Sequence, residues 1–279
     1  MDITVIKQLY TSGKSLAQLG KENQISVYKL KKILIAEGIH IRSKEEQNKY
    51  SPQNQRKYEV YDEFFDELNP TNVYLMGFLA ADGSIQKDGG IKIGLSTIDK
   101  PFLEKVRAIL HSNYPIRDYL TKDGFSVSEF IFRSEKIKQK LAQYGIVNNK
   151  TKTFVFPYNI PKEFYIDFIR GYFDGDGTFC LAGQYCRASL CGYNQEFLQS
   201  VVNVLENQYN IPRVKIQKDN RGNTYYFQYS QISAKKLYEL FYKNNPALYL
   251  PRKYNKCLQL FGEIKSHEPV TSQEEEKII

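Results

Sequence analysis

The 279-residue sequence has no tryptophan and only three histidines, His40, His111 and His267. The histidines are scattered and form neither an HExxH motif nor a cluster with cysteine, which argues against histidine-based metal or general-base chemistry. No apolar run reaches the roughly 18–20 residues that a membrane-spanning helix needs. The N-terminus, MDITVIKQLY, lacks the basic start and long apolar core of a secretory signal. We therefore expect no membrane partner, and a cytoplasmic or organellar-matrix location rather than secretion.

Cysteine is scarce as well. The four cysteines are Cys180, Cys186, Cys191 and Cys257, and they include no CxxC pair. The first three lie within twelve positions. This spacing disfavours a zinc site or a disulfide framework. We predict reduced thiols in the protein core.

Positive charge is the main compositional bias, with 39 Lys and Arg against 31 Asp and Glu and a formal net charge of +8. Residues 1–57 carry 11 basic and 5 acidic side chains, and residues 68–262 carry 26 basic and 16 acidic. The joint at 58–67 and the tail at 263–279 are acidic. Two basic bodies predict a polyanionic partner, although a merely soluble surface has a similar composition.

Residues 1–48 are predicted to form a small all-α domain of three short helices, in which Ser15 and Ser26 are suitable N-caps. The third helix presents basic and aromatic side chains on its outer side, among them Tyr28, Lys29 and Lys32. A helix pair with a basic second helix is typical of the helix-turn-helix, whose second helix enters the major groove of DNA. An ordinary three-helix bundle with a solvated lysine face has the same spacing. Residues 49–69 are predicted to be a linker, and residues 263–279 an acidic tail.

An internal duplication follows the linker. Residues 70–164 and 165–262 each show the order helix, two strands, helix, two strands, helix. The copies align at a near-constant offset, since Asp82 and Asp176 are 94 positions apart. We therefore predict an α+β fold of two pseudo-symmetric αββαββα repeats, each with a four-stranded antiparallel sheet. Helices would cover the apolar face of each sheet and leave a basic polar face open, which suits duplex DNA.

The helices that open the two copies share an unusual pattern. Small residues stand one turn apart at Gly77 and Ala81 in the first helix, and at Gly171 and Gly175 in the second. Small residues at this spacing let two helix backbones touch. Each helix then ends in Asp-Gly, which places two carboxylates at abutting helix C-termini. This arrangement is unfavourable unless a cation lies between them, and few hard oxygen ligands suit Mg²⁺. The pattern predicts a divalent-metal site for phosphodiester chemistry.

The segments YLMGFLAADG (74–83) and FIRGYFDGDG (168–177) resemble the two motifs of a single-chain LAGLIDADG homing endonuclease. The resemblance covers about residues 70–260, and two such motifs at the matching spacing are far more specific than one. Residues 1–48 look like the helix-turn-helix segment that precedes the core in some free-standing members.

The resemblance implies a monomer with an internal pseudo-two-fold, whose two sheets form a saddle over a long DNA site. It implies that Asp82 and Asp176 bind the metals beside the scissile phosphates, assisted by the main-chain carbonyls of Ala81 and Gly175. Mg²⁺ is the implied cofactor, with Mn²⁺ able to substitute and Ca²⁺ able to bind without supporting cleavage. Both DNA strands would be cut to leave short 3′ overhangs.

The family also places a basic residue near each metal. The best matches are Lys150 in NNKTKT, with Lys152 as the second choice, and Lys253 in LPRKYNK. A phosphate-contacting or merely exposed lysine is the alternative for each. The sixth motif position, often Asp, is Ala80 in the first helix and Asp174 in the second. No clear match exists for the polar residue that some members use near the metal, since Ser96 and Cys191 are only rough equivalents.

Side chains alternate between the two faces of a strand, so counting in steps of two from Asp82 identifies candidate DNA-facing residues on both sheets. In the first copy they are Ser84, Gln86, Lys92, Arg117, Tyr119, Glu129 and Arg133. In the second copy they are Thr178, Arg187, Ser189, Arg213, Lys215, Gln217 and Gln228. The basic members contact either phosphates or bases, and only base contacts specify sequence.

Three functions are compatible with these features. The first is a site-specific double-strand DNA endonuclease, the second a non-cleaving DNA-binding regulator on the same core, and the third an RNA maturase. Both motif carboxylates are retained, which favours the nuclease, although RNA stays possible as a partner. The chain starts at Met1 and ends in EEEKII rather than in a His-Asn splice junction. We therefore expect a free-standing gene rather than an intein.

Overall fold

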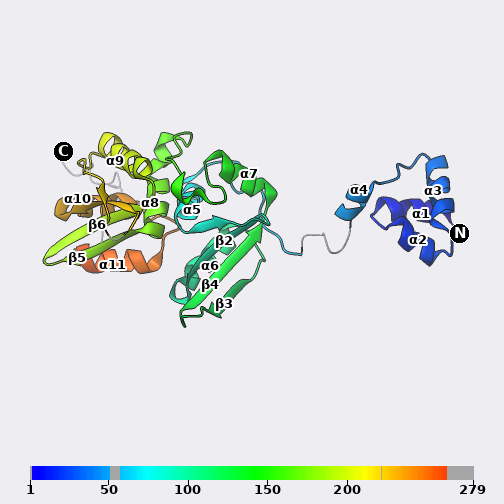
Figure 1. Ribbon diagram of the computed structural model, residues 1–279, viewed down its shortest axis with the longest axis horizontal. Helices are drawn as coiled ribbons and strands as arrows, with labels where there is room; N and C mark the ends of the chain where they lie inside the picture. The colour runs from blue at the N-terminus through cyan, green and yellow to red at the C-terminus, as the bar shows by residue number, and fades with distance from the viewer. Residues whose placement is uncertain (1, 51–56, 221, 263–279) are drawn as a thin grey trace, which may run out of the picture. The chain divides into compact units, whose positions relative to one another are not determined.

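The structure is a computed structural model that describes residues 2–50, 57–220 and 222–262. The chain divides into two compact units, Met1–Tyr58 and the part from Glu59 onward, and each is described by itself (Figure 1). The acidic tail predicted at 263–279 lies outside the described residues.

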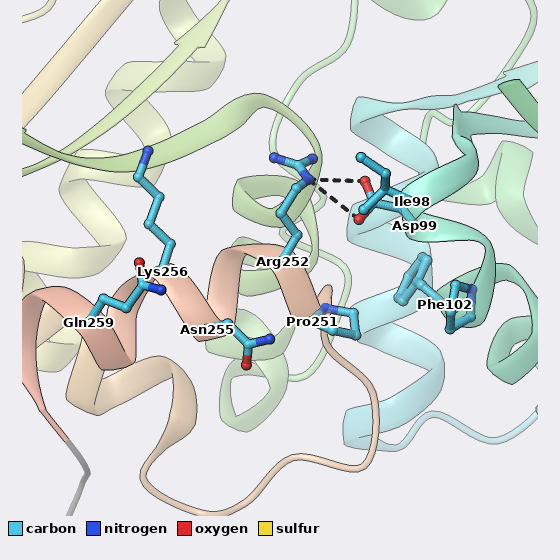
Figure 2. Close-up of a pocket in the computed structure, with 9 residues that line it drawn as sticks. Ile98, Asp99, Phe102, Pro251, Arg252, Asn255, Lys256 and Gln259 are labelled. Atoms are coloured by element: carbon cyan, nitrogen blue, oxygen red, sulfur yellow. Dashed lines mark hydrogen bonds and ion pairs between the residues drawn. The ribbon is translucent and has the colours of Figure 1, made fainter. Parts of the chain in front are cut away.

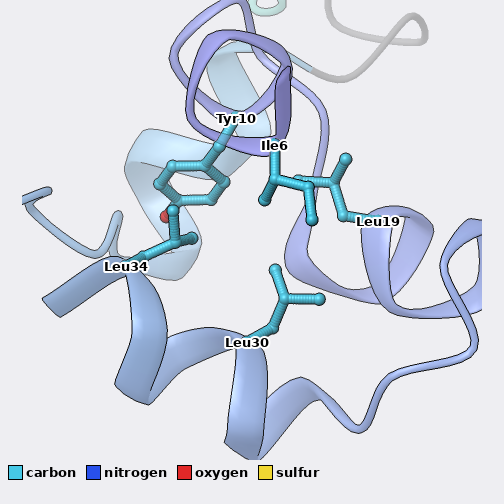
Figure 3. Packing of buried hydrophobic residues seen from close by; sticks show 5 residues of the cluster. All are labelled: Ile6, Tyr10, Leu19, Leu30 and Leu34. Carbon is cyan, nitrogen blue, oxygen red and sulfur yellow. The ribbon is translucent and has the colours of Figure 1, made fainter. Parts of the chain in front are cut away.

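The first unit is entirely helical. Its helices are α1 (Ile3–Thr11), α2 (Leu16–Glu22), α3 (Val27–Ala36) and α4 (Lys44–Lys49). The Ser15 side chain accepts a hydrogen bond from the Gln18 backbone N–H in a capping box, and the Ser26 side chain caps α3 by accepting one from the Lys29 backbone N–H. Figure 3 shows the small core that these helices enclose, made of Ile6, Tyr10, Leu19, Leu30 and Leu34.

The segment between the units is shorter than the predicted linker 49–69. Helix α4 begins at a capping box that we overlooked, in which Ser43 and Glu46 exchange hydrogen bonds. At the other end, the backbone N–H of Tyr61 donates to the carbonyl of Leu110 at 2.8 Å, and that of Glu59 to Asn113 Oδ1 at 2.6 Å. Residues from Glu59 onward therefore pack on the first repeat rather than forming a free tether.

The second unit contains both repeats in the predicted order. The first consists of α5 (Pro70–Ala81), β1 (Gly83–Ile85), β2 (Gly90–Ser96), the short η1 (Thr97–Asp99), α6 (Lys100–Ile109), β3 (Ile116–Leu120), β4 (Ser126–Arg133) and α7 (Glu135–Gln143). Two short turns, η2 (Lys150–Lys152) and η3 (Lys162–Phe164), lead to the second repeat.

The second repeat consists of α8 (Tyr165–Asp176), β5 (Gly177–Ala182), β6 (Tyr185–Gly192), α9 (Gln195–Tyr209), β7 (Gln217–Lys218), β8 (Tyr225–Ser230) and α10 (Gln231–Tyr242), with α11 (Pro251–Phe261) added after it. The αββαββα order of both repeats confirms the predicted α+β fold. The alternation of RVKIQK (213–218) predicts one strand, but β7 covers only Gln217–Lys218 of this segment. Pro212, which has no backbone N–H to pair, lies just before the part that is not in the strand.

Each repeat forms one antiparallel four-stranded sheet, in the orders β1-β2-β4-β3 and β5-β6-β8-β7. Alternate side chains of each sheet are buried against helices, for example Ile91, Ile93 and Phe130 in the first sheet and Phe179 and Leu190 in the second. The opposite face of each sheet is polar and open. Figure 1 shows α5 and α8 side by side between the two sheets. Among the described helices, none is both long and apolar enough to cross a membrane.

Candidate active site

Helices α5 and α8 touch through their glycines. A Cβ added to Gly77 would lie 2.1 Å from the carbonyl oxygen of Phe168, and one added to Gly171 would lie 2.0 Å from that of Tyr74. Such distances leave no space for any side chain, so the predicted small-residue contact between the helices is present. The Asn69 side chain caps the start of α5 through the backbone N–H groups of Thr71 and Asn72.

The contact brings the two motif aspartates together at the C-terminal ends of the helices. A Cβ added to Gly175, in the last turn of α8, would lie 3.4 Å from Asp82 Cγ and 2.4 Å from Ala81 Cβ. Asp176 ends the same helix, one residue after Gly175. Both carboxylates therefore lie where their helices meet and the first strand of each repeat begins.

The electrostatics of the pair is unfavourable in the absence of a cation. Asp82 is open to solvent on one side, but the protein around its other sides desolvates the carboxyl. This burial, followed by the charge of Asp176, raises the pKa of Asp82 to about 6. Burial also raises the pKa of Asp176, while the nearby Tyr172 hydroxyl lowers it in part. The two carboxylates thus resist being ionised together, and a bound divalent cation would relieve this resistance.

Lys253 lies beside the second aspartate. Only 9% of the residue is exposed, and its Nζ donates to the carbonyl oxygens of Gly175 at 2.8 Å, Gly177 at 2.6 Å and Phe173 at 3.1 Å. Burial lowers its pKa, while the charges of Asp174 and Asp82 act in the opposite direction. The ammonium group is therefore held at the end of α8 by main-chain oxygens.

Lys150 occupies the related place in the first repeat. It is 6% exposed, and its Nζ donates to the carbonyl oxygen of Gly83, the residue after Asp82. Burial lowers its pKa, and the charges of Asp176 and Asp82 oppose that change. Lys152, the second choice from the sequence, is exposed. The structure thus places Lys150 and Lys253, rather than Lys152, beside the aspartates.

The two main-chain carbonyls differ in their surroundings. The carbonyl of Gly175 already accepts the hydrogen bond from Lys253, whereas the described residues make no such contact with the carbonyl of Ala81. The exposed Cys191 lies at the same end of α8, where its Sγ donates to the Asp176 carbonyl at 3.3 Å. Our expectation of four core thiols was therefore wrong for Cys191. Cys180 and Cys186 are partly buried and Cys257 is buried.

Asp174, at the sixth position of the second motif, is buried away from solvent with 1% of the residue exposed. Its carboxylate accepts hydrogen bonds from the hydroxyls of Tyr74 at 2.6 Å and Tyr242 at 3.2 Å. A third bond comes from the backbone N–H of Leu250 at 2.9 Å, which fixes the start of α11. Asp174 therefore links α5, α8 and α10 to the helix that carries Lys253.

Candidate contact residues of the first sheet share its open face. Ser84 lies opposite Lys92, and Arg117 lies opposite Glu129. The remaining candidates on this face are Tyr119 and Arg133, and Gln86 follows β1 with a partly buried side chain. Two of the cations are already paired within the sheet, because Lys92 forms an ion pair with Glu129 and Arg133 forms one with Asp88.

Candidates of the second sheet fall into two groups. Thr178, Ser189 and Gln228 lie in one row across β5, β6 and β8, with Arg187 and Gln217 on the same open face. A cleft of about 580 Å³ over this face is lined by Ser189 and Gln228 together with Lys218 and Asp219. Arg213 and Lys215 are exposed but lie before β7, outside the strand in which we expected them.

Outside the second unit, α3 carries the remaining candidates on its outer surface. Tyr28 is 69% exposed, Lys29 is exposed, and Lys32 Nζ lies 4.7 Å from the centre of the Tyr28 ring. The structure therefore places all three residues where a ligand could reach them.

The metal-binding capacity of the site is limited to oxygen atoms. Across residues 2–50, 57–220 and 222–262 there is no group of three or more His, Cys, Asp and Glu side chains that could hold a metal ion. Two aspartates with main-chain carbonyls nearby fit a hard cation that keeps much of its own water, as Mg²⁺ does. Burial at the helix ends, followed by the charge of Asp176, raises the pKa of Asp82, and a cation between the two carboxylates would offset both effects.

Two features of the site escaped the sequence reasoning. Tyr172, beside Asp176, aligns at the offset of 94 with Phe78, so a direct comparison of the two motifs would have revealed its extra hydroxyl. Arg252 donates from Nε to both carboxylate oxygens of Asp99, at 3.1 and 3.3 Å. This pair joins residues 153 positions apart, and no local pattern in the sequence indicates it.

Comparison with known proteins gives a family and several relatives. The family described as LAGLIDADG-like domain matches residues 70–143 and 163–245. The chain is 30% identical over 152 residues to the DNA-directed RNA polymerase subunit Rpo1C of Methanocaldococcus jannaschii, a match that spans 53% of this chain but only 17% of that protein.

Two solved structures also resemble the chain at low sequence identity. One is the LAGLIDADG meganuclease I-AabMI bound to uncleaved DNA, at 14% identity and a TM-score of 0.45, covering 69% of this chain and 88% of that one. The other is the N-terminal LAGLIDADG domain of DUF199/WhiA, at 17% identity and a TM-score of 0.43, covering 65% of this chain and 89% of that one.

Proposed function

The chain belongs to the LAGLIDADG family, and on this premise we propose that it is a site-specific endonuclease that hydrolyses both strands of a duplex DNA target. The observation that carries the proposal is the meeting of Asp82 and Asp176 at the ends of two touching helices. Two neighbouring carboxylates at helix C-termini are costly in a purely structural role, because each opposes the charge of the other and the negative end of the helix dipole. They are useful where a divalent cation and a phosphodiester are to be held together.

Each side chain of the site has a distinct task in this mechanism. Asp82 and Asp176 would hold Mg²⁺ between the helix ends, and Mn²⁺ would replace it, whereas Ca²⁺ would bind without supporting cleavage. Bound there, Mg²⁺ supplies charge neutralisation at the scissile phosphate and a lowered pKa for the attacking water. Lys150 and Lys253 are fixed by carbonyl oxygens, and their positive charges favour the ionised form of both aspartates. Neither lysine can swing away without losing buried hydrogen bonds.

The open faces of the two sheets supply the surface for the DNA, and cleavage would leave short 3′ overhangs. A chain with two repeats carries one DNA-binding sheet for each half of the target, so it would act as a monomer. Ser189, Gln228 and Arg117 on these faces have the side-chain chemistry to contact base edges or phosphates. The first unit would add contacts through Tyr28, Lys29 and Lys32 on α3.

Cleavage selection on a plasmid library with Mg²⁺, followed by sequencing of the ends, tests the proposal directly. Active protein would yield one long recognition sequence and a fixed overhang. Asp82→Asn and Asp176→Asn should each abolish cleavage while leaving DNA affinity nearly unchanged, because the carboxylates act on the metal rather than on DNA. Binding without cleavage by the unaltered chain would instead identify a DNA-binding regulator. Binding to RNA but not to duplex DNA would instead indicate an RNA maturase.

The contribution of α3 is tested separately by the double variant Lys29→Gln with Lys32→Gln. If both lysines contact phosphates, the slope of log affinity against log salt concentration should fall by about two. Lys7→Gln on α1 is the matched control, because Lys7 is already paired with Glu37. An unchanged slope in the double variant would mean that the first unit does not bind the DNA backbone through α3.

A further inference from the structure

A second basic feature lies in a cleft of about 490 Å³ between the two repeats. Ile98 and Asp99 of the first repeat form one wall, and Arg252, Asn255 and Lys256 of α11 form the other (Figure 2). The two basic residues stand one helical turn apart. Figure 2 shows their side chains extending from the same side of α11, whereas Asn255 extends from the opposite side.

Only the Nε of the Arg252 guanidinium is bound within the described residues, and the partner is Asp99. This Nε donates to both oxygens of Asp99, whose side chain is 3% exposed, while the side chain of Arg252 is 54% exposed. Within the described part of the chain, the two Nη groups of Arg252 make no hydrogen bond. A guanidinium has five N–H donors in a planar fork, so the four Nη–H donors remain available at a fixed position.

The position of this fork relates it to the aspartate pair. Arg252 lies in the first turn of α11, whose start is fixed to α8 by the hydrogen bond from the Leu250 N–H to the Asp174 carboxylate. Arg252 also directly precedes Lys253, which contacts the carbonyls on both sides of Asp176. Its donors are therefore offered at the same end of the helix pair as the two carboxylates.

We propose that Arg252, fixed by Asp99, binds a backbone phosphate of the DNA beside the cleavage site, and that Lys256 binds the next phosphate along the same strand. The proposal rests on the endonuclease function and adds a phosphate-binding track on α11, outside the open faces of the sheets. Guanidinium groups bind phosphate oxygens through paired N–H donors, and a side chain that is already fixed loses less conformational entropy on binding. Asp99 is a positioning residue in this arrangement.

Salt-dependent binding of the full chain to a fluorescent 30-base-pair duplex tests the track, with EDTA present to prevent cleavage. Each phosphate contact contributes about 0.9 to the slope of log affinity against log salt concentration. Arg252→Gln and Lys256→Gln should each lower the slope by about one. Arg252→Lys should keep the slope and lose affinity several-fold, because a lysine cannot bridge Asp99 and a phosphate together. Arg107→Gln on α6, away from the open faces, is the matched control and should keep the wild-type slope.

The outcomes separate the track from the function on which it rests. An inter-repeat ion pair without a phosphate role would lower the melting temperature in both Arg252→Gln and Asp99→Asn and leave both slopes at the wild-type value. That result would overturn the proposal while DNA binding itself persists. Failure of the unaltered chain to bind any duplex would overturn the endonuclease function as well. A normal far-ultraviolet circular dichroism spectrum for each variant excludes misfolding as the cause of a changed slope.

Discussion

The clearest physical consequence of the aspartate pair is that neutralising Asp82 should stabilise the metal-free protein. Burial and the neighbouring Asp176 raise the pKa of Asp82 to about 6, from its ordinary value of 3.8. The folded state therefore binds the Asp82 proton more tightly than the unfolded state does. Its contribution to stability is fully present below pH 3.8 and is lost as the pH rises through 6. At pH 8 the ionised carboxylate destabilises the fold, and Asp82→Asn removes that cost.

The size of the effect follows from the pKa difference. A difference of roughly two pKa units corresponds to at most about 3 kcal/mol. Because the carboxyl is open to solvent on one side, screening reduces this to about 1 kcal/mol. In a unit of this size, that change raises the melting temperature by about 2–4 °C. Mg²⁺ should reverse the order, since a ligand at 100 times its dissociation constant stabilises the folded state by about 2.7 kcal/mol, and Asp82→Asn weakens its binding.

Differential scanning calorimetry of the full chain at pH 4 and pH 8, with EDTA or with Mg²⁺, measures these effects. Asp82→Asn should melt above the wild type at pH 8 in EDTA, melt near it at pH 4, and melt below it in saturating Mg²⁺. Asp88→Asn is the control of opposite sign, because the hydrogen bond from Arg133 lowers the pKa of Asp88 and favours its charged form. A variant that melts at or below the wild type at pH 8 in EDTA would refute the electrostatic reasoning.

Two further predictions concern the helices that carry the site. Gly171→Ala should reduce the free energy of unfolding by about 3 kcal/mol or more, because its Cβ would lie 2.0 Å from the Tyr74 carbonyl oxygen. Gly94→Ala, whose Cβ would lie 3.6 Å from Lys92 Cε, should change it by less than about 1 kcal/mol, and urea titration measures both variants. Asp174→Asn should slow single-turnover cleavage more than it weakens DNA binding, because Asp174 fixes the start of α11 through Leu250. Equal losses of cleavage and affinity would contradict that role.

The fold was predictable because its signals are repeated and local. The spacing of small residues in α5 and α8 predicts close contact between two helix backbones, and the structure shows that contact at Gly77 and Gly171. Alternation of apolar and polar residues likewise identified the buried face of β2 through Ile91 and Ile93. Helix α4 was missed although its capping signal, Ser43 with Glu46, is also local. That signal precedes a polar helix, and hydrophobic periodicity cannot reveal such a helix.

The site was predictable only in part, because its remaining members are joined by tertiary contacts. Lys253 reaches Gly177 over 76 positions, and it was identified through a motif rather than through any physical pattern. Arg252 and Asp99 form their pair only after the two repeats have folded together. The pairing of Lys92 with Glu129 depends on the register between β2 and β4, which the sequence does not specify to a single residue.

The two halves of the site are not equivalent, although they arise from one duplicated plan. Asp176 lies beside the Tyr172 hydroxyl, whereas the matching position near Asp82 is Phe78, which has no donor. Lys253 contacts three carbonyls, and Lys150 contacts one. The ionised form of Asp176 is therefore favoured by a neighbouring hydroxyl that Asp82 lacks. In the proposed endonuclease, this difference would make the two halves of the site unequal toward the two DNA strands.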